Sequence, residues 1–242
     1  MKTKRIWEID ALRGVAIVMM IAYHTLWGLN LSGLISYTQI NTGFWRAFAY
    51  TTATIFIFLV GVSLTLSFSR VNKKNHDYVF KYIQRGLAVF GCGAIITALT
   101  YLLYPDAFVY FGILHFIGVG IILAIPFLPY KKLNLVLGAV LLALGTAFYN
   151  ITLNVPWFML LGFRFWGMST LDFFPILPWF GVILLGIFVG NAFIPNGRLK
   201  LKVPEIPLRN ALAFLGRYSL IIYFLHIILI FGAIFIIKQF WL

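Results

Sequence analysis

The chain has 242 residues, of which 62% are hydrophobic and only 10% are charged, and its mean hydropathy is +0.97. This composition is typical of a polytopic membrane protein and excludes an ordinary soluble domain. The net charge of +13 does not indicate nucleic-acid binding, because the Lys and Arg residues lie in loops between apolar segments and form no basic stripe.

The N-terminal segment resembles a signal peptide only at its start. The apolar stretch after the basic residues is long, holds Asp10, Arg13 and His24, and lacks a convincing small-residue cleavage site. We therefore interpret it as the first membrane span. The single cysteine, Cys92, lies in an apolar run, so an intrachain disulfide framework is excluded.

Apolar runs of about 20 residues define the predicted spans. The fold class expected is an all-α polytopic membrane protein, a single domain over 1–242 with about seven transmembrane helices. They are predicted at 10–31, 44–68, 79–104, 109–128, 133–149, 172–193 and 212–238.

Prolines and glycines mark irregular places in this pattern. The stretch 151–171 contains Pro156, Arg164 and several aromatic residues, and we expect an interfacial or re-entrant segment there. Pro175 and Pro178 are expected to kink the outer end of the sixth span. The Gly216-Arg217 pair is expected to break the seventh span into a short and a long piece.

The distribution of Lys and Arg predicts the orientation of the chain. It places the N-terminus in the cytoplasm and the C-terminus outside, in a multi-pass protein of the cell membrane. The predicted outer segments hold only Arg46, Arg164 and Lys238. The predicted inner segments hold Lys2, Lys4, Arg5, Arg70, Lys73, Lys74, Lys81, Arg85, Lys131, Lys132, Arg198, Lys200, Lys202 and Arg209.

The first span carries three ionisable side chains, which are costly in hydrocarbon and therefore tend to be functional. Arg13 and His24 are eleven residues apart, so on a helix they point the same way, about 16 Å apart along the axis. Asp10 and Arg13 form an i,i+3 pair. One helix face thus presents a carboxylate and a guanidinium at the cytoplasmic end and an imidazole deeper in.

Other polar residues follow the same division by depth. Arg85 is predicted at the cytoplasmic end of the third span, His115 in the outer part of the fourth, and Asp172 at the outer mouth of the sixth. His226 is predicted near the middle of the seventh. A cationic cytoplasmic end with imidazoles deeper in suits a ligand with phosphates at one end and a reactive group at the other.

Four sequence blocks carry a family resemblance. The block DALRG at 10–14, with a histidine eleven residues after the arginine, resembles the first-helix motif of transmembrane acyltransferases. Together with FIFLVGVSLTLS at 56–67, YFGILHFIG at 110–118 and FFPILPWFG at 173–181, it resembles the heparan-α-glucosaminide N-acetyltransferase catalytic-domain family in its compact prokaryotic form. The resemblance implies transfer of an acetyl group from cytoplasmic acetyl-CoA to an amino sugar or glycan acceptor on the outer side, with N-acetylation favoured over O-acetylation.

Candidate catalytic residues are His24, Asp10, His115 and Asp172. His24 is expected to act as a general base, because neutral imidazole has a suitable pKa range; an acetyl-imidazole intermediate is the alternative. Asp10 either orders Arg13 or caps the first span. His115 and Asp172 either line the acceptor side or serve as an interhelical hydrogen-bond partner and a cap of the sixth span.

Candidate cofactor-binding residues are four arginines. A guanidinium fork suits the phosphates of CoA, and the alternative is snorkelling to lipid headgroups. The four arginines are Arg13, Arg85, Arg70 and Arg217.

His226 and Tyr223 are expected to be interhelical polar contacts, and no metal site is predicted.

Two other functional classes compete with the acetyltransferase. One is a proton-coupled small-molecule transporter that uses His24, His115 and Asp172 as a relay; the other is a structural membrane protein. The alignment of Arg13 with His24 favours the enzyme, because a relay needs more closely spaced polar steps. The expected partners are acetyl-CoA or CoA, the sugar acceptor and membrane lipids, and the oligomeric state stays open, a homodimer included.

Overall fold

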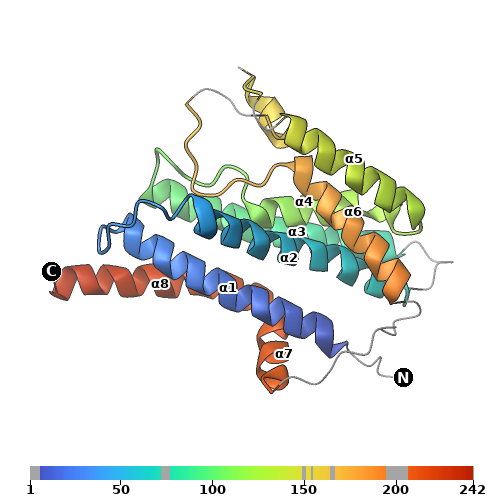
Figure 1. Ribbon diagram of the computed structural model, residues 1–242, viewed down its shortest axis with the longest axis horizontal. Coiled ribbons are helices and arrows are strands. Elements are labelled where there is room, and N and C mark those ends of the chain that lie inside the picture. The colour runs from blue at the N-terminus through green and yellow to red at the C-terminus, as the bar shows by residue number, and fades with distance from the viewer. Residues whose placement is uncertain are drawn as a thin grey trace. The chain divides into compact units, whose positions relative to one another are not determined.

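The structure, a computed structural model, describes residues 6–71, 77–148, 151–153, 155–163, 167–194 and 207–241. Apart from isolated bridges, one of which joins Phe111 and Phe173, these residues form helices and loops (Figure 1). The helices are α1 (Trp7–Leu31), α2 (Gly43–Phe68), α3 (Asp77–Leu103), α4 (Ile113–Leu123), η1 (Ile125–Phe127), α5 (Lys132–Phe148), η2 (Pro156–Leu161), α6 (Ile176–Phe193), α7 (Arg209–Arg217) and α8 (Ser219–Trp241).

Five of these helices are long and apolar enough to cross a membrane: α1, α2, α3, α6 and α8. The all-helical membrane fold predicted from composition is therefore confirmed. Helices α4 and α5 are apolar but shorter, so the count of seven spans and the orientation of the termini stay predictions.

Two compact units divide the chain, and each is described by itself. The first comprises residues 1–56 and 202–242, and contains α1, the start of α2, α7 and α8. Within it, α1 and α8 lie side by side, and α7 crosses them steeply (Figure 1). The predicted break of the seventh span is confirmed, because α7 ends at Arg217 and α8 begins at Ser219.

Glycines allow α7 to approach α1 at backbone distance. A Cβ atom on Gly14 would overlap the Leu212 carbonyl, and one on Gly216 would overlap the Asp10 carbonyl. Small residues of this kind are the usual way in which membrane helices pack closely, since lipid gives no hydrophobic drive for helix association.

The second unit comprises residues 57–201. Here the second half of α2 packs on α6 through Gly61 and Gly186, and α3 packs on α4 through Gly86 and Gly118. Fully buried side chains fill the space between these helices, among them Ile57, Leu64, Tyr82, Phe116, Ile121, Ile183, Leu184 and Ile187.

Two predicted spans begin later than the apolar pattern indicates. Helix α4 begins at Ile113 and α6 at Ile176, because the residues before them pair with each other. Phe174 donates its N–H to the Phe111 carbonyl at 2.9 Å, and Leu171 donates to the Ala107 carbonyl at 2.9 Å. Helix α4 also ends early, at a 3-10 turn that contains Pro126, which lacks the N–H to continue an α-helix.

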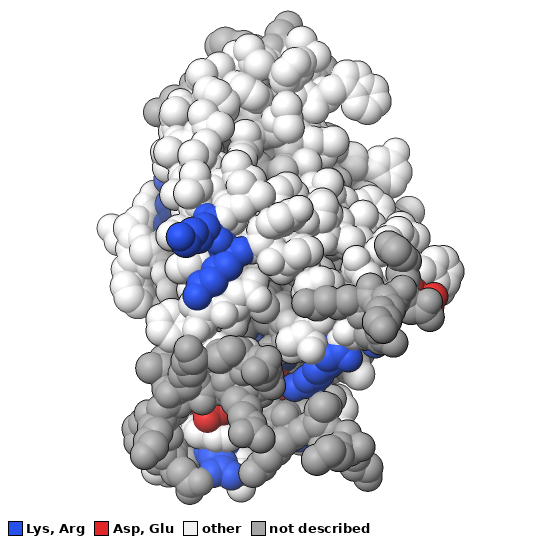
Figure 2. All heavy atoms as spheres, turned by 90° about the vertical axis from the view of Figure 1, so that its right-hand side faces the viewer, with Lys and Arg blue, Asp and Glu red and all other residues white. Residues whose placement is uncertain are grey.

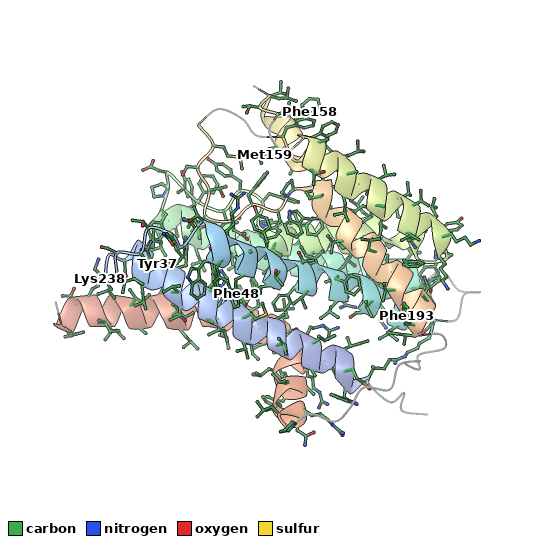
Figure 3. The ribbon with its side chains drawn as sticks, in the orientation of Figure 1. Tyr37, Phe48, Phe158, Met159, Phe193 and Lys238 are labelled. Carbon is green, nitrogen blue, oxygen red and sulfur yellow. The ribbon has the colours of Figure 1, made fainter. Side chains whose placement is uncertain are left out.

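The stretch 151–171 contains a short 3-10 helix, η2, which ends at Leu161 and is followed by Gly162 with φ +104°. Phe158 and Met159 of this helix are labelled in Figure 3, and Trp157 is 82% exposed. Arg164, in the same segment, lies outside the described residues. The interfacial location of the segment stays a prediction.

Candidate active site

Asp10 and Arg13 form an ion pair in the first turns of α1. Arg13 Nη1 donates to Asp10 Oδ1 at 3.1 Å, and Asp10 is buried, with only 8% of its surface exposed. The helix begins at Trp7 with Ile6 as its N-cap residue. The alternative in which Asp10 caps the first span is therefore wrong, and its carboxylate orients the guanidinium instead.

Helix α7 covers this ion pair from one side. The position of a Cβ atom on Gly216 is 3.0 Å from Arg13 Cβ, which places α7 directly against the pair. Arg217 follows Gly216 and is exposed, and the guanidinium of Arg209 lies over the Trp7 ring, 5.0 Å from its centroid. This packing was not predicted from the sequence, in which Gly14 and Gly216 were the available signal.

His24 pairs with a histidine from the far end of the chain. His24 Nδ1 and His226 Nε2 are 2.9 Å apart, although the two residues are separated by 202 positions in the sequence. His226 is buried, with 4% exposed, and its Nδ1 lies 2.5 Å from the Tyr223 carbonyl oxygen. The prediction that His226 makes an interhelical contact is confirmed, and the partner in that contact is the candidate base.

The helix pair that carries these histidines is also held by other contacts. Beside the His24–His226 pair, called the dyad below, Trp27 of α1 packs edge-on against Phe231 of α8 at 6.1 Å between ring centroids. At the end of α8, Lys238 Nζ donates to the Ser32 carbonyl at 2.7 Å. Figure 3 labels Lys238 and Tyr37 at this end of the first unit.

A second polar cluster, in the second unit, surrounds His115, which is buried with 5% exposed. The N–H of Gly112 donates to His115 Nδ1 at 3.3 Å, and His115 Nε2 lies 3.3 Å from Thr97 Oγ1. Thr97 in turn donates its hydroxyl hydrogen to the Val109 carbonyl at 2.7 Å. In the neutral ring, Nε2–H is therefore the donor to Thr97, and both ring nitrogens have partners.

Asp172 lies beside this cluster and caps α4. Its Oδ2 accepts the N–H of Ile113 at 2.9 Å, where the partial positive charge of a helix N-terminus favours a carboxylate. The alternative in which Asp172 caps the sixth span is therefore wrong. Asp172 lies in the loop before α6, and its burial raises the pKa of the carboxyl to about 6, against the opposing effect of the Ile113 N–H.

Residues 5–228 match the family described as heparan-alpha-glucosaminide N-acetyltransferase, catalytic. The chain belongs to this family. The match covers most of the 242 residues, including the Asp10–Arg13 pair, the His24–His226 pair and the cluster around His115. No curated protein and no solved structure matches the chain.

Membership of this N-acetyltransferase family supports acyltransferase activity in general, in a membrane protein. For the family in general, it also implies acetyl-CoA as the donor and a glycan as the acceptor. Among the described residues, no group of three or more His, Cys, Asp or Glu side chains could hold a metal ion.

The candidate phosphate-binding arginines of this family member fall in both units. Arg13 and Arg217 are in the first unit, beside the contact of α1 with α7. Arg70 and Arg85 are exposed in the second unit, the former just beyond the end of α2 and the latter on α3. In Figure 2, the Lys and Arg side chains lie among described side chains that are mostly uncharged. Lys73, Lys74, Lys200 and Lys202 lie outside the described residues.

Proposed function

We propose that this protein is a transmembrane acetyltransferase that takes an acetyl group from cytoplasmic acetyl-CoA and transfers it to an amino sugar or glycan acceptor on the outer side. The observation that carries the proposal is the set of polar side chains on α1 and their spacing. This one helix holds an arginine oriented by Asp10 and, eleven residues on, a histidine, about 16 Å away along the axis.

The arginine end of α1 suits the phosphates of the donor. A guanidinium forms planar, charge-assisted hydrogen bonds that match phosphate oxygens. Asp10 holds the Arg13 guanidinium in one orientation, so less conformational freedom is lost when phosphate binds. An extended pantetheine arm spans the distance from there to His24.

The histidine end suits the transfer step. As the acceptor amine or hydroxyl attacks the thioester carbonyl carbon, His24 takes its proton, and a C–N or C–O bond forms. The C–S bond then breaks, and the CoA thiolate leaves and recovers the proton from the imidazolium. We favour the amine as the acceptor, because the matched family is described as an N-acetyltransferase.

The experiment is turnover of purified protein with saturating acetyl-CoA and a panel of amino sugars. His24→Ala should lower kcat by about 10²–10⁴, the usual contribution of a general base, while leaving CoA affinity nearly unchanged. Thr25→Ala is the matched control, because the hydroxyl of this neighbouring residue donates to the Ile21 carbonyl of its own helix, at 2.8 Å. Activity of His24→Ala within a few-fold of wild type would remove His24 from the mechanism.

Radiolabelled acetyl-CoA without acceptor separates the two possible routes. Direct transfer leaves no label on the protein. Label that is stable in wild type and absent in His24→Ala would instead show an acetyl-imidazole intermediate, and His24 would then be a nucleophile.

A further inference from the structure

We infer that His226 is a positioning residue that fixes the tautomer of His24 and leaves His24 Nε2 as the basic atom. The inference rests on the proposed role of His24 and adds a residue that the first-helix motif does not contain. It follows from the hydrogen-bonding capacity of three groups in the first unit: the Tyr223 carbonyl, His226 and His24.

The Tyr223 carbonyl determines which nitrogen of His226 carries a hydrogen. A carbonyl oxygen only accepts hydrogen bonds, and it lies 2.5 Å from His226 Nδ1. That nitrogen must therefore carry a hydrogen. In a neutral imidazole the other nitrogen is then an acceptor, so His226 Nε2 presents its lone pair toward α1.

His24 completes the sequence of donors and acceptors. Its Nδ1 lies 2.9 Å from the His226 Nε2 lone pair, so with both rings neutral Nδ1 carries the hydrogen. His24 Nε2 then keeps its lone pair. A general base requires this free lone pair. In histidines generally, the hydrogen bond that one ring nitrogen makes to a neighbouring residue determines which nitrogen carries the hydrogen.

Helices α1 and α8 do not depend on His226 alone for their contact, so its removal acts mainly on the tautomer of His24. The Trp27–Phe231 and Lys238–Ser32 contacts also join α1 to this part of the chain. Without the acceptor on His226, His24 loses the partner that selects one tautomer. The Nε2–H form then becomes populated, and in that form Nε2 has no lone pair with which to take a proton.

The tautomer is directly measurable, because the chain has only four histidines. Protein labelled with ¹⁵N on histidine is studied at pH 8, above the ordinary pKa of about 6.5, and single substitutions assign the ring signals. We expect His24 to be protonated on Nδ1 in wild type. His226→Leu should give a mixture of tautomers, and His226→Gln, whose amide oxygen can accept the same hydrogen bond, should restore Nδ1–H.

Phe231→Leu is the matched control, since it weakens contact between the same two helices without touching the dyad, and it should leave the tautomer unchanged. In turnover, His226→Leu should lower kcat about 10–100-fold, as for other groups that orient a functional histidine. KM for acetyl-CoA should stay constant, and His226→Gln should recover most of the loss.

An Nε2–H tautomer of His24 in wild type would overturn the inference, as would an unchanged tautomer in folded His226→Leu. Where His226→Leu does not fold, the wild-type tautomer decides. The test is separate from that of the proposed function. If His24→Ala remains active, the enzyme does not use His24 as a base, whether or not His226 sets the tautomer.

Discussion

At the scale of single residues, Asp10 determines where the Arg13 guanidinium points, because the two side chains are joined by a hydrogen bond of 3.1 Å in a partly buried position. The first-helix motif thus combines a charged group with the residue that orients it. The same division recurs deeper in α1, where His24 has its partner on another helix.

Removal of the Arg13 guanidinium tests its role toward phosphate. Arg13→Ala should weaken CoA binding about tenfold to a hundredfold, because a hydrogen bond to a charged group contributes roughly 1.5–3 kcal/mol. Asp10→Asn should have a smaller effect in the same direction. Titration calorimetry measures both, with Arg46→Ala as a control that removes a charge from the predicted outer side. Unchanged affinity in Arg13→Ala would instead favour a contact with lipid headgroups.

The other three candidate arginines are tested in the same titration. Arg85→Ala, Arg70→Ala and Arg217→Ala each remove one exposed guanidinium. A loss of CoA affinity assigns that residue to the donor site, and an affinity equal to that of wild type assigns it to the loops or the lipid surface.

Asp172 predicts a pH dependence of stability. Its pKa in the folded protein, about 6, is above the ordinary value of 3.8, so the folded state binds this proton more tightly than the unfolded state. The stabilisation is complete below pH 3.8 and is lost as the pH rises through about 6. As the pH falls from 7 to 5, wild type should therefore gain thermal stability relative to Asp172→Asn. Parallel melting curves of the two proteins across this range would contradict the assignment.

At the scale of elements, the apolar pattern predicted helices well wherever a single run of sequence decides them. For α1, α2, α3 and α5, both ends lie within three residues of the prediction. The starts of α4 and α6 were placed too early, because residues before these helices bond to each other, as Phe174 and Phe111 do. A pairing between two distant loops leaves no periodic signal in either of them.

The candidate site also contains one feature that a single run of sequence decides and one that depends on a contact between distant segments. The Asp10–Arg13 pair follows from helical spacing alone, and the structure contains it. The His24–His226 contact joins positions 202 apart, and helical periodicity does not relate residues on different helices. The presence of His226 within an apolar helix was the available sign that it serves more than packing.

The contact between α1 and α7 provides a test at the level of helices. Gly216→Ala should force α7 away from the Asp10 backbone, since its Cβ atom would overlap that carbonyl. Overpacking typically costs about 1–3 kcal/mol, which should appear as a lower melting temperature in detergent. Gly232→Ala is the matched control, because a Cβ atom at this glycine of α8 meets nothing within 4 Å. Equal melting temperatures of the two variants would contradict the packing argument.

At the scale of the whole molecule, orientation in the membrane is the prediction on which the proposed reaction depends most. Single cysteines at Asn41 and Ser69, in a Cys92→Ala background, lie at exposed positions on opposite predicted sides. A reagent that does not cross the membrane should label Asn41→Cys in intact cells and spare Ser69→Cys until the membrane is broken. The reverse pattern would place the donor and acceptor on the wrong sides.

The pairing of His24 with His226 also has a consequence for how the protein is made. The ribosome releases α1 first, and the partner of its histidine is synthesised 202 residues later. During most of synthesis, therefore, His24 is in the membrane without the group that orients it. A chain that stops after α6 carries the complete first-helix motif but only one histidine of the His24–His226 pair, so in the proposed mechanism premature termination yields a product whose base lacks its partner.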